Sequence, residues 1–394
     1  MPWEVKTVEM SRLEFIQKVL EERNISKICR ENNITRATGY KWLKKYNENQ
    51  MLSDQSRRPL HTPNKTPEET EQKILEMRLE HPTWGPRKVK RHLNNIGETN
   101  LPALSTISDI FKRNNLITKE AHLAHIPYVR FERENPNELW QADFKGEFPL
   151  YDNTYCYPLT VLDDHSRFSL CIDVKKDLKG AGVFESFKRL FEEYGLPDSI
   201  LTDNGNPWGV SQRTGYTLFE IWLMELDIYP IHGRALHPQT QGKEERFHRT
   251  LKEDVIKRTI LLNHGHAQKV FDEWRHEYNY ERPHDALNLD TPSKHYKKSK
   301  RKISPIISEL EYYKESNTRK VNTRGYFCYN NHMYFLGYAF SGKYIEIAES
   351  SKPNHINLNF RNYRIAKLNL EEQLFVSKTL RQLTPDRLHV ADRL

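Results

Sequence analysis

Cysteine is scarce in this chain, with four residues in 394, and no two of them form a Cys-x-x-Cys pair. This excludes a disulfide framework and a thiolate zinc site, so we expect Cys29, Cys156, Cys171 and Cys328 to be small apolar residues of the interior. No apolar run approaches the ~18 residues that a membrane span needs. The first ten residues also lack an apolar signal region. We therefore expect an intracellular, soluble, cytoplasmic protein with no membrane partner.

Charge is unevenly distributed along the chain, although the net value of +8 is ordinary for this length. Residues 1–130 carry 23 Lys and Arg against 16 Asp and Glu. Residues 131–300 carry 23 against 28, and residues 301–394 carry 15 against 9. Basic flanks around an acidic middle predict arms that hold a polyanion and a centre that uses carboxylates.

The first 50 residues are predicted to form an all-α helix-turn-helix domain. Leu13, Ile16, Val19 and Leu20 recur at helical spacing, and a second short helix follows from Ser26. Thr35 is a suitable N-cap for a third helix, which has an apolar face of Tyr40, Leu43 and Tyr46. In this motif the last helix enters the major groove of DNA. The residues expected to contact DNA, unless they form only a solvated basic face, are Thr35, Arg36, Thr38, Lys41, Lys44 and Lys45.

A second helical domain is predicted over residues 68–117, after a linker of residues 51–67 that is rich in proline and hydroxyl groups. In the linker, Arg57 and Arg58 either follow the phosphates of DNA or are plain linker charges. In the second domain, Gly85-Pro86 precedes a basic helix in which Arg87 and Lys88 are candidate DNA contacts. A connector of residues 118–135 follows.

Residues 136–296 alternate between strand and helix patterns. The expected strands are Trp140–Phe144, Tyr155–Leu162, Phe168–Val174, Ser199–Thr202 and Ile228–His232. The expected helices are Phe184–Tyr194, Tyr216–Leu226 and Lys243–Thr259. This order implies an α/β domain, with one mixed sheet and helices on its faces.

The last hundred residues are predicted to hold a small β domain. Residues 297–317 have the composition of a basic linker, and residues 318–368 have the short strand patterns of a small barrel. Residues 369–394 are expected to be a tail with room for one helix.

Three acidic residues stand out in the central domain. Asp143 lies in the strand segment WQADF, Asp203 ends a strand in LTDNG, and Glu245 opens a helix in QGKEERFHRTLK. An unpaired carboxylate on an apolar strand is costly to bury, which favours a metal at Asp143. Phosphodiester transfer needs charge neutralisation, an activated oxygen and a stabilised leaving oxygen, and two divalent ions supply all three. Mg²⁺ prefers carboxylate oxygens, so we expect two Mg²⁺ ions, which Mn²⁺ can replace.

These motifs resemble the acidic motifs of the DDE transposase and retroviral integrase superfamily, whose core has a ribonuclease H-like fold. VLDDHSRF (161–168) and YNYERPHDALNLDTPSKHY (278–296) resemble further parts of the core of bacterial insertion-sequence transposases. The third acid of the family matches Glu245, and Glu244 is the alternative third ligand. The resemblance also implies that Arg249 and Lys252 lie near the DNA end, the alternative being an ion pair between Glu245 and Arg249.

The resemblance implies a DNA transposase that binds the terminal inverted repeats of an insertion sequence, cleaves them and transfers the freed strand to another DNA. Because two ends must be joined together, it implies a homo-oligomer, at least a dimer on double-stranded DNA, in the bacterial nucleoid. No small-molecule cofactor is expected. A nuclease that only hydrolyses, and an inactive DNA-binding regulator, are the alternatives that the sequence leaves open.

Overall fold

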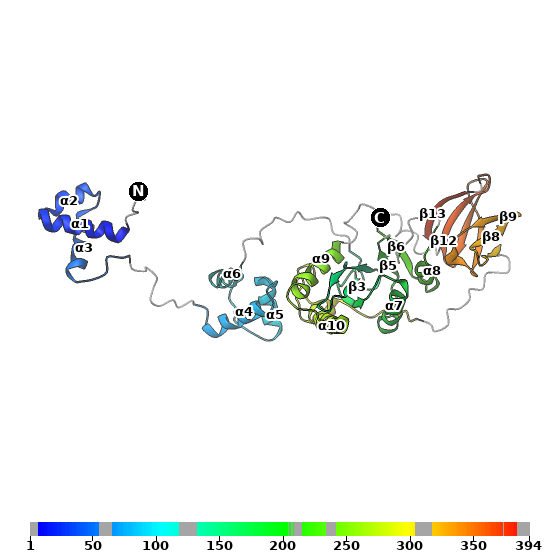
Figure 1. The fold of residues 1–394 in the computed structure, drawn as a ribbon, viewed down its shortest axis with the longest axis horizontal. Coiled ribbons are helices and arrows are strands. Elements are labelled where there is room, and N and C mark those ends of the chain that lie inside the picture. The colour runs from blue at the N-terminus through cyan, green and yellow to red at the C-terminus, as the bar shows by residue number, and fades with distance from the viewer. Residues whose placement is uncertain are drawn as a thin grey trace. The chain divides into compact units, whose positions relative to one another are not determined.

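The computed structural model describes residues 7–54, 65–117, 132–203, 205, 208, 215–233, 242–303, 317–372 and 374–383. The chain divides into two compact units, Met1–Thr66 and Pro67–Leu394, which we describe separately (Figure 1). The predicted DNA contacts Arg57 and Arg58 lie outside the described residues. No helix in the described part of the chain is both long and apolar enough to cross a membrane.

The N-terminal unit is the predicted three-helix domain, formed by α1 (Val8–Glu22), α2 (Ile25–Glu31) and α3 (Arg36–Asn47). Thr35 caps α3 as predicted, because its hydroxyl accepts a 3.2 Å hydrogen bond from the Thr38 N–H. The core of this unit consists of Phe15, Ile16, Val19, Ile28, Cys29 and Trp42.

The predicted apolar face of α3 is correct at Leu43, which packs against the core, but wrong at Tyr40 and Tyr46. Tyr40 and Tyr46 are exposed, whereas Gly39 and Trp42 are buried. Close packing explains the difference: a Cβ atom on Gly39 would lie 2.5 Å from the Cys29 sulfur. The outer side of Trp42 is covered by the Arg12 guanidinium, 3.8 Å from the ring centroid. The helix thus turns its smallest residue, rather than its tyrosines, toward α2.

The second unit begins with the second predicted helical domain, which consists of α4 (Glu68–Glu80), α5 (Pro86–Asn95) and α6 (Leu104–Arg113). Its core is centred on the fully buried Trp84, with Ile74, Val89, Leu93, Ile107, Ile110 and Phe111 around it. Pro86 occupies the first turn of α5, where its missing N–H costs no hydrogen bond.

The central domain is built on one mixed sheet, with the strand order β2-β3-β1-β5-β6 and β4 on the far side of β3. β1 is antiparallel to β3 and parallel to β5. The strands are β1 (Trp140–Phe144), β2 (Phe148–Pro149), β3 (Tyr155–Asp163), β4 (Ser169–Lys175), β5 (Ser199–Thr202) and β6 (Tyr229–His232). Each long predicted strand is present within two residues of its expected bounds, and the sheet is mixed as predicted.

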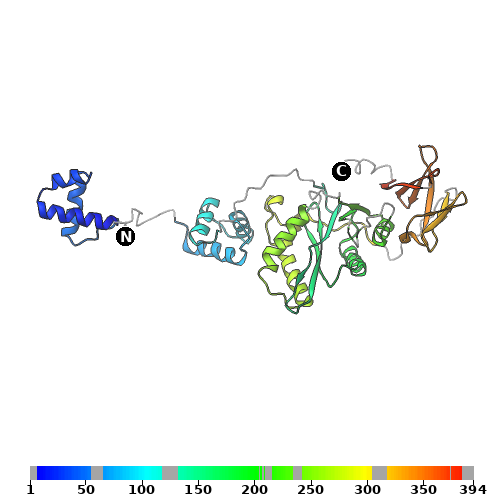
Figure 2. The same cartoon turned by 45° about the horizontal axis from the view of Figure 1, so that its top comes forward.

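Helices cover both faces of this sheet (Figures 1 and 2). On one face, α7 (Gly180–Tyr194) and α8 (Leu218–Glu225) pack against alternate residues of β1 and β3, including Trp140, Ala142, Leu159 and Val161. On the other face lie α9 (Gly242–Leu251), a π-helical turn (Lys252–Ile256) and α10 (His264–Tyr280). A short α11 (Pro292–His295) follows. Because alternate strand residues point to opposite faces, Gln141 and Asp143 face away from the α7 side.

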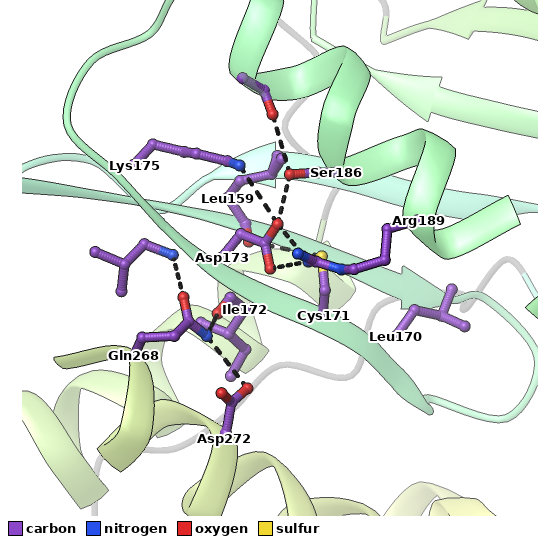
Figure 3. Close-up of polar contacts among 12 residues, drawn as sticks. Leu159, Leu170, Cys171, Ile172, Asp173, Lys175, Ser186, Arg189, Gln268 and Asp272 are labelled. Carbon is purple, nitrogen blue, oxygen red and sulfur yellow. Dashed lines mark hydrogen bonds and ion pairs between the residues drawn. The ribbon is translucent and has the colours of Figure 1, made fainter. Parts of the chain in front are cut away.

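Polar side chains of α10 bond to the outward backbone of the edge strand β4 (Figure 3). Gln268 accepts from the Val174 N–H at 2.9 Å and donates to the Ile172 carbonyl at 3.0 Å. Arg275 donates to the Leu170 carbonyl, and Asn279 bonds both the N–H and the carbonyl of Ser169. On the α7 side, Asp173 accepts from Ser186 and Arg189. Side chains therefore satisfy the outward hydrogen-bonding groups of the β4 backbone at this edge of the sheet.

Residues 297–303, predicted as part of a linker, pack on the central domain instead. The Ser299 N–H donates to the Tyr194 carbonyl at 2.8 Å, and the Leu196 N–H donates to the Arg301 carbonyl at 2.8 Å. The Arg301 guanidinium bonds Asp198 at 3.2 Å and the carbonyls of Pro197, Leu226 and Asp227. The basic composition of this segment resembled that of a linker, but these contacts join the segment to residues much earlier in the chain.

Gly195 makes this packing possible. Its φ is +83°, and a Cβ atom there would lie 2.6 Å from the Arg301 carbonyl oxygen and 2.8 Å from that of Ser299. We expect Gly195→Ala to destabilise the protein by about 1–3 kcal/mol, since it adds backbone strain and a steric clash. Gly182→Ala is the control: its Cβ would meet nothing closer than 3.7 Å, and in helix α7 the change should stabilise by about 0.5–1 kcal/mol. Thermal unfolding followed by tryptophan fluorescence should move in opposite directions for the two variants.

The C-terminal β domain contains a five-stranded sheet, in the order β13-β12-β11-β10-β7, and a separate hairpin of β8 and β9. The strands are β7 (Thr318–Lys320), β8 (Tyr326–Tyr329), β9 (His332–Phe335), β10 (Tyr344–Glu349), β11 (His355–Phe360), β12 (Tyr363–Asn369) and β13 (Leu374–Gln382). β13 lies in the predicted tail, which therefore holds a strand where we expected room for a helix. β13 pairs along all of β12 and completes the sheet.

This domain shares a hydrophobic core with α8 of the central domain. Tyr216, Ile221 and Met224 lie in one cluster with the buried residues of the C-terminal strands. The Tyr216 hydroxyl donates to the Ile365 carbonyl at 2.7 Å. The opposite side of α8, including Phe219 and Leu223, belongs to the central core. α8 is therefore shared between the two domains.

Candidate active site

Asp143 lies on β1, opposite Thr160 of β3, on the face of the sheet that α9 covers. Its side chain is 24% exposed. Burial, followed by the charge of Asp203 and to a smaller extent that of Glu245, raises the pKa of Asp143 to about 7, although a hydrogen bond from the Phe144 N–H lowers it. The three predicted acids therefore interact electrostatically, although they come from three separate segments of the chain.

Asp203 directly follows β5, at the same end of the sheet as Asp143. Its Oδ1 accepts a 3.0 Å hydrogen bond from the Gly205 N–H. A Cβ atom on Gly205 would lie 3.2 Å from Asp203 Oδ2, so the glycine leaves room for the carboxylate. The Gly205 N–H thus holds the Asp203 carboxylate in place.

Behind Asp203 lies a pair of residues that the sequence analysis did not identify. His232 of β6 has Nδ1 3.0 Å from the Asp203 carbonyl oxygen and Nε2 2.9 Å from Glu220 Oε1. Glu220 is 1% exposed and also caps α8, since it accepts from the Thr217 N–H at 2.7 Å. The backbone of Asp203 is therefore braced from α8 through the imidazole ring. In the sequence, this pair was signalled only by a His at the end of a strand and a Glu three residues after a Thr.

The two adjacent glutamates of α9 lie in different environments. Glu245 is exposed, whereas Glu244 is fully buried. Burial, with a smaller contribution from Asp143, raises the pKa of Glu244 well above its ordinary value. Burial therefore disfavours the ionised form of Glu244, which is the form that binds a cation. Glu245, which is exposed, stays the predicted third acid, with Glu244 as the alternative.

Glu244 belongs to a buried polar cluster beneath Asp143. The Thr160 hydroxyl lies 3.1 Å from Glu244 Oε2, 2.7 Å from His248 Nε2 and 3.1 Å from the Asp143 carbonyl oxygen. Burial lowers the pKa of His248 to about 3, so its ring is neutral. His248 Nδ1 lies 4.0 Å from Asp143 Oδ2. Thr160 and His248, which the sequence analysis missed, therefore connect β1, β3 and α9 through neutral groups.

A buried ion pair fixes the first turn of α9. Lys243 Nζ lies 2.5 Å from Asp164 Oδ1 and 3.1 Å from the Asp164 carbonyl oxygen. Asp164 also accepts from Gln141 at 2.6 Å. The neighbouring Asp163 carboxylate accepts hydrogen bonds from the N–H groups of Asn137 and Ser166. The lysine two residues before Glu245 therefore anchors the helix that presents this acid.

The donor set of Asp143, Asp203 and Glu245 fits a hard divalent cation. All three offer carboxylate oxygens, which are the ligands that Mg²⁺ prefers. Burial and then the charges of Asp203 and Glu245 disfavour the ionised form of Asp143, and a bound cation would favour it. In the ranges that the structure describes, no three His, Cys, Asp or Glu side chains are arranged to hold one metal ion together. The acids thus have the right chemistry for a metal site without forming a complete ligand shell.

The helix after Glu245 differs from the continuous helix that we predicted over Lys243–Thr259. α9 ends at Leu251, and residues Lys252–Ile256 form a π-helical turn. Asp254 in this turn lies 2.5 Å from the Arg282 guanidinium and 3.3 Å from Trp274 Nε1, so Arg282 braces the core. These buried partners favour the wider turn, a feature that is frequent near functional sites.

Arg249 and Lys252, the predicted DNA contacts of this helix, are both exposed like Glu245. No ion pair joins Glu245 to Arg249, two residues that the structure describes. Lys145 lies near Lys252, since burial and then the charge of Lys252 lower the pKa of Lys145. DNA contact by Arg249 and Lys252 stays a prediction.

The predicted DNA contacts of the helical domains differ in exposure. On α3, Arg36, Lys41 and Lys44 are exposed, Thr38 and Lys45 are half-buried, and the cap residue Thr35 is exposed. On α5, Arg87 lies 3.6 Å and Lys88 3.8 Å from the carboxylate of Asp285. Burial, with the charge of Arg282 next, lowers the pKa of Lys88 to about 8. DNA contact by α3 needs no rearrangement, whereas contact by Lys88 would have to replace Asp285.

Asp143→Asn should raise the stability of the metal-free protein at pH 8. The folded-state pKa of Asp143, about 7, lies above the ordinary carboxyl value, so ionisation of Asp143 destabilises the folded state above pH 7. The advantage of the variant should shrink as the pH falls through 7 toward 4, where the native carboxyl is protonated in both states. The thermal midpoint in EDTA measures this effect.

Added Mg²⁺ should then raise the thermal midpoint of the unaltered protein, but not that of Asp143→Asn, because ligand binding stabilises only the state that binds. A metal-free variant that is less stable than the unaltered protein at pH 8 would contradict this account of Asp143.

Comparison with protein families assigns known domain types to these parts. Residues 133–238 and residues 226–292 match two models described as integrase core domain. Residues 11–59 match a helix-turn-helix domain, and residues 38–111 match a homeodomain-like domain. The integrase core matches include Asp143, Asp203 and Glu245, and the helical matches include α1 to α5 and most of α6.

Two curated relatives are proteins of bacterial insertion elements. A protein of insertion element IS407 from Burkholderia multivorans is 28% identical over 171 residues, which is 42% of this chain and 59% of the relative. A protein of insertion element IS476 from Xanthomonas euvesicatoria is 27% identical over 158 residues, 40% of this chain and 44% of the relative. The chain thus spans about half the length of these relatives.

Among solved structures, the magnesium complex of the HTLV-2 integrase catalytic core domain is 16% identical, with a TM-score of 0.32. The similarity covers 41% of this chain and 99% of that domain.

Proposed function

Since this chain is a member of the DDE integrase superfamily and is related to insertion-element proteins, we propose that it is a DNA transposase. In this proposal the helical domains bind the terminal inverted repeats of a mobile element. The integrase core cleaves a phosphodiester at each end, which frees a 3′-hydroxyl, and then joins that hydroxyl to another DNA strand. Joining exchanges one phosphodiester for another, so no external energy source is needed.

One observation supports the proposal: Asp143 is partly buried, and Asp203 and Glu245 lie near enough that, after burial, their charges also raise its pKa. Three acids that repel one another in a partly buried site have little structural purpose, because an unpaired buried charge destabilises the fold. Asp143, Asp203 and Glu245 would together hold two Mg²⁺ or Mn²⁺ ions. Such ions neutralise the scissile phosphate, activate the attacking oxygen and stabilise the leaving oxygen when bound.

The remaining residues of the site position these acids. The Lys243–Asp164 ion pair holds the first turn of α9 against the sheet, and so orients Glu245. His232 and Glu220 hold the backbone of Asp203. Thr160 and the neutral His248 pack beneath Asp143 without adding charge. The exposed Arg249 and Lys252 would contact the phosphates of the DNA that enters the site.

The partners follow from the reaction. Two ends of one element must be joined to one target, so we propose that at least two copies of the chain assemble on double-stranded DNA. Thr35, Arg36, Thr38, Lys41, Lys44 and Lys45 on α3 would read the element ends, since the early residues of the last helix of such a motif reach base edges.

A strand-transfer assay tests the proposal. The full chain is mixed with a labelled duplex of the element end, already cut to expose its 3′-hydroxyl, and with a supercoiled plasmid in Mg²⁺. Joined products that carry the label in the plasmid are expected. Cleavage of an uncut end without joined products would instead identify a nuclease that only hydrolyses, and binding without either reaction would identify a regulator.

A further inference from the structure

The lysines of residues 297–303 do not take part in the function proposed above, but they lie along a cleft of the central domain. The cleft has a volume of about 670 Å³. Its lining includes Lys294, Lys297, Lys298 and Lys300, together with Glu134 and Asp198. Asp198 is already paired with Arg301 at 3.2 Å, so the lining carries a clear excess of positive charge.

We propose that Lys297, Lys298 and Lys300 bind the phosphate backbone of duplex DNA at a site separate from Asp143, Asp203 and Glu245. DNA is the occupant that the charge favours, since a phosphate backbone offers closely spaced negative charges to a cluster of lysines.

The backbone of residues 297–303 is held in place by hydrogen bonds. The lysines therefore form an ordered site and do not belong to a mobile tail. Ser299 and Arg301 face inward, where the Ser299 hydroxyl donates to the Leu196 carbonyl at 2.7 Å and Arg301 bonds Asp198 and three carbonyls. Lys298 and Lys300 alternate with them and are exposed, and the neighbouring Lys297 is exposed as well. Side chains that alternate in this way lie about 7 Å apart along an extended chain. Because folding already orders the backbone that carries these lysines, DNA binding costs less conformational entropy.

The floor of the cleft is equally ordered. The Asn137 side-chain amide donates to the Lys297 carbonyl at 2.7 Å, and its Oδ1 accepts from the Tyr296 hydroxyl at 3.0 Å. Lys298 Nζ lies 5.4 Å from the centroid of the Tyr194 ring. Lys294 is less available, because it lies 3.4 Å from Asp290. Lys297, Lys298 and Lys300 are consequently the residues on which the proposal depends.

The cleft lies at the end of the sheet opposite the three acids. Its residues 134–137 precede β1 and Asp198 precedes β5, whereas Asp143 lies near the end of β1 and Asp203 follows β5. β1 and β5 are parallel. The turn at residues 137–139 and the strand from Trp140 to Asp143, about 10 Å long, separate the cleft from Asp143. DNA held here is therefore bound at a different end of the sheet from the phosphate that reacts.

The first test is protection of lysines in the unaltered full chain. The protein is acetylated briefly with and without a random-sequence duplex, in EDTA so that no cleavage occurs, and the modified lysines are identified by mass spectrometry. We expect the duplex to protect Lys297, Lys298 and Lys300 severalfold, and to leave Lys176, Lys179 and Lys188 unprotected. These three controls are also exposed lysines of the central domain. Equal acetylation of both sets, or protection by polyglutamate and not by DNA, would overturn the proposal.

The second test is the salt dependence of DNA binding by a triple variant, Lys297→Gln, Lys298→Gln and Lys300→Gln. Each lost phosphate contact lowers the slope of log affinity against log salt by about one, so the slope should fall by about three. The matched variant Lys176→Gln, Lys179→Gln and Lys188→Gln loses the same charge and should keep the native slope. Identical slopes for both variants would contradict the site. The readout is independent of cleavage and joining, so failure of the transposase proposal would not alter it.

Discussion

Asp203→Asn is expected to reduce cleavage and joining of DNA more than about 10²-fold, while DNA affinity stays unchanged. Replacing a residue that only supports a metal ligand costs about 10–100-fold, and loss of a ligand itself should cost more. Asparagine keeps the size of the side chain and can still accept the 3.0 Å hydrogen bond from the Gly205 N–H. The local turn should therefore survive while the negative charge is lost. The strand-transfer assay with labelled element ends measures the effect.

The control for this experiment is Asp177→Asn, at an exposed aspartate beyond the end of β4. It should leave both reactions and DNA binding at native levels. Undiminished cleavage by Asp203→Asn in Mg²⁺ and in Mn²⁺ would remove Asp203, and with it the proposed site, from the reaction.

Glu245→Gln and Glu244→Gln are expected to differ sharply, although the two residues are adjacent. Glu245 is exposed and lies near Asp143, whose pKa it helps to raise, so the loss of its charge should reduce both reactions more than about 10²-fold. Glu244 is fully buried and its pKa is raised well above the ordinary value. Glutamine has nearly the shape of a protonated glutamate, so Glu244→Gln should keep activity within about tenfold of native.

Each variant serves as the matched control for the other, since both remove one carboxyl from the same turn of α9. Thermal unfolding should confirm that both remain folded. The reverse result, with Glu244→Gln inactive and Glu245→Gln active, would show that the buried glutamate is the third ligand and that its proton is displaced by the metal.

The sequence was informative wherever a local pattern decides the structure. The strands around Asp143 and Asp203 have alternating or continuous apolar residues, and the turn at Gly205 has the glycine that the carboxylate requires. Because these short motifs place an acid near the end of a strand, Asp143 and Asp203 could be named as candidates from the sequence, whereas Glu245 lies on a helix and was chosen through the family resemblance. The cap of α3 at Thr35 was predictable for the same reason.

The sequence was less informative where contacts between residues far apart in the chain decide the structure. The π-helical turn depends on Arg282 and Trp274, which lie far along the chain from Asp254. Residues 297–303 have the composition of a linker, and only Gly195 and the carbonyls near it make them part of the core. α10 was not predicted as a helix, although the buried residues Phe271, Trp274 and Tyr278 have helical spacing.

The arrangement of α10 along β4 has a consequence for the behaviour of the chain at high concentration. An open strand at the margin of a sheet normally templates the addition of foreign strands, which leads to fibrils. Here the outward backbone carbonyls of Leu170 and Ile172 and the outward N–H of Val174 are already hydrogen-bonded to the side chains of Gln268 and Arg275. A strand from another molecule would first have to displace α10, which is also packed in the core. This edge of the sheet is therefore protected against the addition of further strands.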